Sequence, residues 1–119
     1  MYGQGLTRGR TAKLGVNAST NQACAVLFNI NNSIIMTDYL WIYLIGEYDR
    51  MRELASGNNQ PNLNAQMIKD YSVIIPSLEV QKNIIKNVNT IKNRIKDLNN
   101  KSLKNKEEAI LVFEKEIFN

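Results

Sequence analysis

Residues 77–118 read SLEVQKNIIKNVNTIKNRIKDLNNKSLKNKEEAILVFEKEIF, a stretch that contains neither glycine nor proline. Ser77 is a suitable N-cap and Glu79 places a negative charge in the first turn, so the stretch predicts a helix that begins after Ser77. Forty residues at helical rise would reach about 60 Å, far more than a small domain needs for its own core. We therefore expect this helix to pack against another helix.

An apolar seam runs along the predicted helix. From Ile84 to Leu98 apolar residues follow spacings of four, three, four and three, the heptad pattern of a helix with a helical partner. The same register meets polar residues beyond Leu98, and a shifted register recovers an apolar face, so we expect a stutter, a kink or a break near Asn99 and Asn100. The residues expected at the helix interface are Ile84, Val88, Ile91, Ile95, Leu98, Ile110, Phe113 and Ile117.

Residues 1–76 predict a small α/β (α+β) domain with a mixed sheet. Apolar runs bounded by turn residues predict short strands over Thr11–Leu14, Asn21–Asn29 and Tyr71–Ile75, the last ended by Pro76. We expect this sheet and a short helix to form one domain, and residues 77–119 to form a long C-terminal helix for antiparallel helix–helix packing.

Two helices are predicted inside the domain. Apolar residues recur at helical spacing after Thr37 or Asp38, either of which is a plausible N-cap, and this pattern ends near Ala55. Asn64 can cap a second, short helix over residues 65–69. The amide-rich segment 56–62 between them should be a loop.

The composition of the chain indicates the cellular compartment in which we expect the protein. The chain has 15 Lys and Arg against 11 Asp and Glu and a single cysteine, Cys24, which cannot form an intrachain disulfide and suits a reducing compartment. The most apolar run, Tyr39–Ile45, is too short to span a bilayer. We expect a soluble, cytoplasmic protein with no membrane contact.

The sequence lacks the residues of common catalytic sites. It has no histidine, which excludes Ser-His and Cys-His triads and imidazole metal sites. The glycines at positions 3, 5 and 9 precede a predicted strand instead of opening a helix, so they do not form a nucleotide-binding fingerprint. We expect no enzyme activity, no cofactor and no metal site; a small nucleotide-binding enzyme is the weakest alternative.

Two polar loops are candidates for binding nucleic acid. Arg, Asn and Gln can read base edges, while Thr and Lys suit phosphates. The simpler alternative is that Asn and Gly only build turns, because 17 asparagines occur in the chain. The candidate DNA-binding residues are Thr7, Arg8, Arg10, Lys13, Asn58, Asn59 and Gln60.

The order of these pieces resembles a known family. Gly3-x-Gly5-x-Thr7-x-Gly9-x-x-Ala12-x-Leu14-Gly15 is followed by Asn21-Gln22-Ala23, then Gly57-x-x-Gln60-Pro61-Asn62-Leu63, Ile75-Pro76 and Ser77-Leu78-Glu79-x-Gln81-x-x-Ile84. This order is similar to the second part of a target-recognition domain from the specificity subunit of type I restriction-modification enzymes, and it covers essentially the whole chain.

The resemblance implies sequence-specific DNA recognition without catalysis, with methyltransferase and restriction subunits as partners. It implies a DNA-binding part at residues 1–76 and a dimerisation and spacer helix at 77–119, which would pair as a homodimer or with a second half-subunit. Such a domain has many more residues before Tyr2, so we expect this chain to be the C-terminal portion of a half-subunit. The main alternative is a structural oligomerisation module whose loops do not bind DNA.

Overall fold

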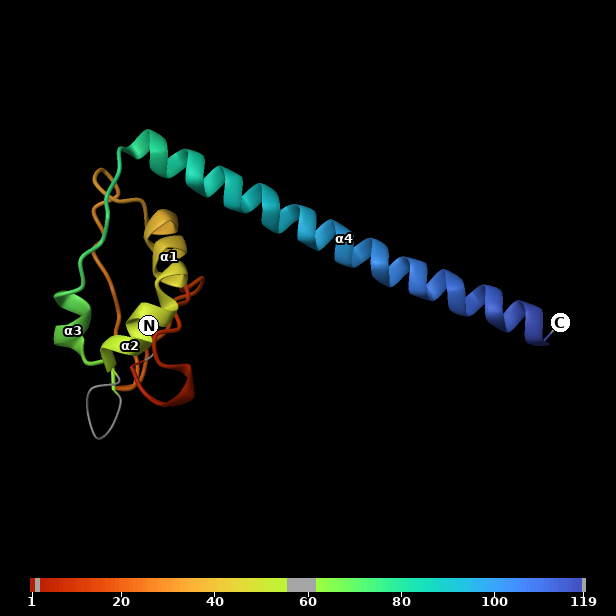
Figure 1. Ribbon diagram of the computed structural model, residues 1–119, viewed down its shortest axis with the longest axis horizontal. Coiled ribbons are helices and arrows are strands. Elements are labelled where there is room, and N and C mark those ends of the chain that lie inside the picture. The colour runs from red at the N-terminus through yellow and green to blue at the C-terminus, as the bar shows by residue number, and fades with distance from the viewer. Residues whose placement is uncertain (2, 56–61, 119) are drawn as a thin grey trace. The chain divides into compact units, whose positions relative to one another are not determined.

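The computed structural model describes residues 1, 3–55 and 62–118. The chain divides into two compact units, Met1–Asn83 and Ile84–Asn119. In chain order the elements are a 3-10 helix η1 (Gly5–Thr7) and the α-helices α1 (Thr37–Gly46), α2 (Tyr48–Leu54), α3 (Ala65–Lys69) and α4 (Leu78–Phe118) (Figure 1). The division of roles between residues 1–76 and 77–119 stays a prediction.

The predicted mixed sheet, and with it the α/β fold class, is wrong. The regular structure of the described residues is helical, and strand character is limited to an isolated bridge at Cys24. Residues 11–14 and 24–27 line one cavity, and no backbone hydrogen bond joins these two described segments. The apolar run after Asn21 is not buried either, since Phe28 is 76% exposed. The apolar side chains of these two segments are therefore not sufficient to pair them as strands of a sheet.

The third predicted strand, Tyr71–Ile75, is extended chain without a ladder. The carbonyl of Ile74 accepts a hydrogen bond from the Tyr39 hydroxyl at 2.8 Å. A side chain of α1 thus pairs with a backbone group of this segment that a neighbouring strand would bind in a sheet. The amide of Tyr71 donates to the carbonyl of Ile68 at 3.3 Å, which belongs to the end of α3. Neighbouring helices thus satisfy part of the backbone that a sheet would otherwise have paired.

The helical prediction for residues 37–55 is confirmed, but the helix begins at a different N-cap and is interrupted in its middle. The N-cap is Met36 instead of Thr37 or Asp38. The Thr37 hydroxyl is occupied elsewhere, because it and the Thr37 amide both donate to Asn32 Oδ1, at 3.1 and 2.9 Å. The helix is also interrupted at Glu47, directly after Gly46, which separates α1 from α2.

The core of the first unit is small. The buried apolar residues that form one cluster come from α1, from α2 and its C-cap, and from the chain before α3: Leu40, Leu44, Met51, Ala55 and Leu63. The short α3 begins as predicted, with the Asn64 side chain accepting a hydrogen bond from the Met67 amide at 2.9 Å. A core of this size leaves only a narrow margin of stability.

Helix α4 runs without a break from Leu78 to Phe118. Ser77 caps it as predicted, since its hydroxyl accepts from the Val80 amide at 3.4 Å. The expected change near Asn99 is therefore a stutter within a continuous helix: at about 100° per residue, the second apolar stripe lies roughly 60° around the axis from the first. From Asn89 to Phe118 every residue is exposed.

Gln81 anchors the first turns of α4 in the first unit. Its side chain is completely buried and makes three hydrogen bonds. Oε1 accepts from the amide of Met36 at 2.8 Å, while Nε2 donates to the carbonyls of Ile34 at 3.0 Å and Pro76 at 2.8 Å. One amide thus joins the start of α4 to the N-cap of α1 and leaves no donor of its own unpaired.

Candidate nucleic-acid interface

The glycine-rich segment of residues 3–10 is held by backbone contacts at its start. The Gly3 amide donates to the carbonyl of Ala23 at 2.9 Å, and its carbonyl accepts from the amide of Leu63 at 2.7 Å. A Cβ at this position would lie 2.5 Å from the Leu63 carbonyl oxygen, so only glycine fits. Gly9, with φ of 86°, brings the segment against Met51 and Tyr48 of α2.

Arg52 of α2 fastens the middle of the same segment. Its Nη1 donates to the carbonyl of Leu6 at 2.6 Å and to the Tyr48 hydroxyl at 2.8 Å. The guanidinium also lies 5.4 Å from the centre of the Tyr48 ring. Hydrogen bonding from Arg52 is the main cause that lowers the pKa of Tyr48, and Arg10 acts in the same direction. Cationic groups from two parts of the chain therefore meet at one phenol.

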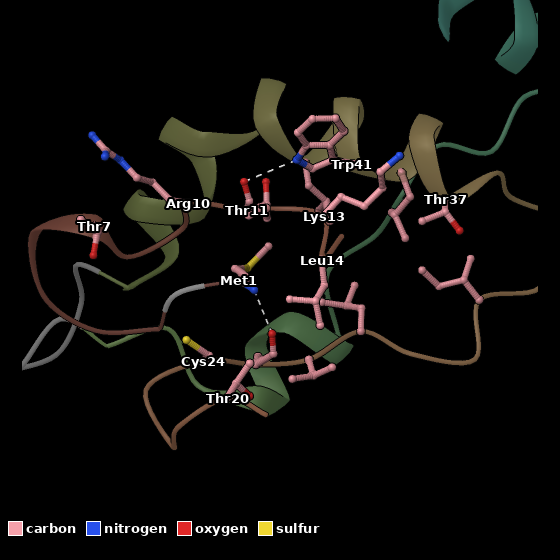
Figure 2. Close-up of a pocket in the computed structure, with 17 residues that line it drawn as sticks. Met1, Thr7, Arg10, Thr11, Lys13, Leu14, Thr20, Cys24, Thr37 and Trp41 are labelled. Carbon is pink, nitrogen blue, oxygen red and sulfur yellow. Dashed lines mark hydrogen bonds between the residues drawn. The ribbon is translucent and has the colours of Figure 1, made fainter. Parts of the chain in front are cut away.

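The predicted residues of this loop occupy different environments. Thr7 and Arg10 are exposed, and the Arg10 side chain extends away from the neighbouring cavity (Figure 2). Arg8 is half-buried: Nη1 donates to the carbonyl of Gly5 at 3.3 Å, and its buried Nε has no hydrogen-bond partner. The structure thus places Arg8 and Arg10 in one loop, with Arg52 and Tyr48 beside it. We name these four residues the arginine cluster.

Lys13 lies apart from the arginine cluster. Its ammonium group forms an ion pair with Asp38 and lies 5.7 Å from the centre of the Trp41 ring. Both side chains of the ion pair are nearly half exposed, so its contribution to stability is small. The charge of Lys13 is nevertheless partly neutralised, which makes it the weaker candidate for a phosphate contact.

A cavity of about 660 Å³ separates the two segments that were predicted to be strands. Its wall is mostly apolar, with Leu14, Leu40 and Leu44 among its lining residues. The indole nitrogen of Trp41 donates to the Thr11 carbonyl at 3.5 Å along this wall (Figure 2). The Thr11 hydroxyl is buried without a partner. Polar side chains also line this cavity, among them Arg10, Lys13 and Thr20.

Three predicted DNA-binding residues, Asn58, Asn59 and Gln60, lie outside the described residues. Conversely, the sequence analysis missed Arg52 and Tyr48. Their spacing of four on a predicted helix would have shown that they share a face. Nothing local, however, indicates that this face meets the segment of residues 3–10, since Leu6 lies 46 positions before Arg52.

The predicted helix-interface residues split into two groups by exposure. Ile84 and Val88 are partly buried. The others are between 52% and 60% exposed in the single chain: Ile91, Ile95, Leu98, Ile110, Phe113 and Ile117. Such a series of large apolar side chains on one helix is typical of a surface that a partner covers.

Searches for membrane and metal-binding features add two findings. None of the helices in the described ranges combines the length and apolarity that a bilayer crossing requires. In the same part of the chain, acidic and cysteine side chains do not gather in groups of three or more that would hold a metal ion.

The sequence profile of the family described as the type I restriction modification DNA specificity domain matches residues 1–108. No solved structure matches the chain.

Proposed function

Because the chain belongs to the family of type I restriction modification DNA specificity domains, we propose that the arginine cluster is part of its DNA-contacting surface and that α4 is its pairing helix. The family is the non-catalytic specificity component, which recognises the DNA target for the methyltransferase and restriction subunits. We also propose that the chain works in the cytoplasm, and that residues 1–76 contact DNA while residues 77–119 pair.

The charge and placement of the arginine cluster support the DNA-contacting role. Arg10 is exposed, and Arg8 and Arg52 are held by the carbonyls of Gly5 and Leu6 in the same loop. Arginine presents several fixed donors that suit phosphates and the edge of guanine. Thr7, at the end of η1, adds an exposed hydroxyl on the same loop. We include four further residues as proposed DNA contacts: Lys13, Asn58, Asn59 and Gln60.

The experiment replaces Arg8 and Arg10 with Ala and measures duplex binding by the full chain across a salt series. Each lost phosphate contact makes the negative slope of log K against log salt less steep by about 0.9, so the slope of this variant should be less steep by about one to two. The control Arg50→Ala with Lys69→Ala removes the same charge from exposed positions of α2 and α3 and should leave the slope nearly unchanged. Unchanged binding of the Arg8 and Arg10 variant at low salt would exclude this loop.

Charge along α4 supports antiparallel pairing with a second copy. Residues 84–106 contain seven Lys and Arg and one acid, whereas residues 107–119 contain four Glu and one Lys. A parallel pair would place like charges together, while an antiparallel pair joins the basic part of one helix to the acidic part of the other. Like charges that face one another across two helices are destabilising.

One antiparallel register also aligns both apolar stripes. When Ile84 of one copy lies opposite Ile117 of the other, Val88 lies opposite Phe113, and Ile91 lies opposite Ile110. The polar stutter then falls at the centre of the pair, around Asn100. This register explains why the stripes are separated by the stutter: each stripe is the partner of the other.

Cross-linking tests the register directly. In a Cys24→Ser background, a Leu98→Cys chain should form a disulfide with a Leu103→Cys chain, because these two positions lie opposite each other near the centre of the antiparallel pair. Ile117→Cys should not cross-link to itself but should cross-link to an Ile84→Cys chain. Self-cross-linking by Ile117→Cys would indicate a parallel pair and would contradict the proposal.

A further inference from the structure

The face of α4 opposite the apolar seam carries only lysine and asparagine between residues 86 and 104. At 3.6 residues per turn, six residues fall within a sector of about 80°, and no other residue type occurs in that sector. All six are exposed. We name this face the Lys/Asn strip; it consists of Lys86, Asn89, Asn93, Lys96, Asn100 and Lys104.

The strip carries positive charge that acids on α4 barely offset. Asp97 is the only acid between residues 84 and 106. Lys86 and Lys96 form no ion pair with any described residue, and Lys104 has a single exposed pair with Glu108 at 3.7 Å. An exposed pair of this kind contributes little, so an anion can displace it. The face is therefore open to a polyanion along its whole length.

We propose that the Lys/Asn strip is a second, sequence-independent DNA contact surface that binds phosphates of the duplex beside the recognised site. The proposal rests on the DNA-binding function of the family and does not require the arginine cluster. Lysine neutralises phosphates as a point charge, and asparagine side chains donate to phosphate oxygens. Because the strip and the seam lie on opposite sides of the helix, a duplex and a second helix can be bound at the same time.

The dimensions of the strip suit a duplex. Lys86 and Lys104 are separated by 18 residues, or about 27 Å along the helix axis, which approaches one turn of B-DNA. Successive lysines are about 15 and 12 Å apart, close to the major-groove width of roughly 12 Å. Each lysine can thus reach a different edge of the groove, while the asparagines fill the intervals.

The test measures binding of the full chain to a duplex of unrelated sequence across a salt series. The strip variant is Lys86→Gln, Lys96→Gln and Lys104→Gln. Glutamine keeps a helix propensity close to that of lysine, and circular dichroism checks the helix. The matched control is Arg94→Gln, Lys101→Gln and Lys115→Gln, which removes the same charge from other faces of α4.

In the strip variant, the negative slope of log K against log salt should be less steep by about two to three, whereas in the control it should be less steep by less than one. At 0.1 M salt this is a loss of about 50- to 500-fold in affinity. Equal losses in both variants would show that only net charge matters, and no loss in either would show that the strip does not bind DNA; each result overturns the proposal. A strip variant that changes the sedimentation of the chain but not its DNA binding would also overturn it, because the strip would then bind the acidic end of a second copy.

The arginine-cluster variant in the same assay separates the two proposals. A normal slope for Arg8→Ala with Arg10→Ala and a reduced slope for the strip variant would refute the loop assignment and support the strip. The reverse pattern would refute the strip and support the loop. Absence of duplex binding by the unsubstituted chain at low salt would overturn both.

Discussion

The two units of this chain are stabilised in different ways. Among the residues that the structure describes, burial is confined to the first unit, where six apolar residues and Gln81 are buried. In the second unit, every described residue from Asn89 onward is exposed. The first unit therefore has an internal core, whereas the helix of the second unit follows from its local sequence and leaves its apolar stripes exposed in the single chain. A helix can be complete in the single chain while its packing is not.

Polar contacts between distant residues supplement the small core of the first unit. Glu47, at the junction of α1 and α2, accepts a hydrogen bond from Tyr71 and pairs with Arg50 at 3.3 Å. Burial, together with the hydrogen bond to the Glu47 carboxylate, raises the pKa of Tyr71 to about 12. The protonated phenol is thus the form that suits the fold. In the second unit, the one ion pair among described residues is the exposed contact of Lys104 with Glu108.

Breaking the apolar seam should give the largest effect. We expect Ile91→Asp with Ile95→Asp to weaken pairing about 1,000-fold, because the two carboxylates of each copy would have to be buried, at a total cost of about 4 kcal/mol for the pair. Sedimentation velocity over a concentration series measures this effect. If the chain is a DNA-recognition component, its DNA complex should be lost as well; retention of that complex would separate pairing from DNA binding.

The control for the seam variant is Asn89→Asp with Asn93→Asp. It adds the same charge to the same two turns of α4 but on the opposite face. Pairing should persist in this variant. Dissociation of both variants alike would mean that charge, and not the apolar seam, governs association.

Removing the Gln81 anchor should give the next largest effect, and it should act on the first unit alone. Gln81→Leu leaves the Met36 amide and the carbonyls of Ile34 and Pro76 without their partner, which should cost about 3 kcal/mol of unfolding free energy. Gln66→Leu is the control, since Gln66 is exposed and bonds only to Asp70. Urea denaturation followed by Trp41 fluorescence measures both. A loss below 1 kcal/mol for Gln81→Leu would show that the anchor is dispensable.

A smaller effect is expected at the contact between Gly3 and Leu63, which lies two residues before α3. Gly3→Ala places a Cβ 2.5 Å from the Leu63 carbonyl oxygen, and the strain should reduce stability by about 2 kcal/mol. Gly15→Ala is the matched control, because nothing lies within 4 Å of a Cβ there. The same denaturation assay compares the two. Equal stability of the two variants would mean that Gly3 moves away from Leu63 without cost.

Local signals predicted the helices well. The short α3, capped by Asn64, and the long α4, capped by Ser77, both follow from capping residues and from the spacing of apolar side chains. These signals act within a few positions along the chain, so the sequence alone carries them. The interruption at Glu47 was not predicted, although Gly46 directly before it is a residue that weakens helices.

The strands and most of the site depended on distant contacts. Thr11–Leu14 and Asn21–Asn29 have strand-like composition, but a strand needs a partner, and the tertiary structure places a cavity between these segments. The same limit applies to the arginine cluster: Arg8 and Arg10 were candidates by type, whereas Arg52 joined them only because α2 packs on their loop.

Residue type and order along the chain are sufficient to predict the long helix, its two apolar stripes, the Lys/Asn strip and the resemblance to a DNA specificity component. All of these depend on residue type and spacing along one continuous segment or on motif order. Tertiary packing, in contrast, leaves the described residues of the first unit without a sheet, buries Gln81 as an anchor and pairs Lys13 with Asp38. The physical reason is that hydrogen-bond and charge partners far apart in sequence are chosen by packing, which local patterns do not encode.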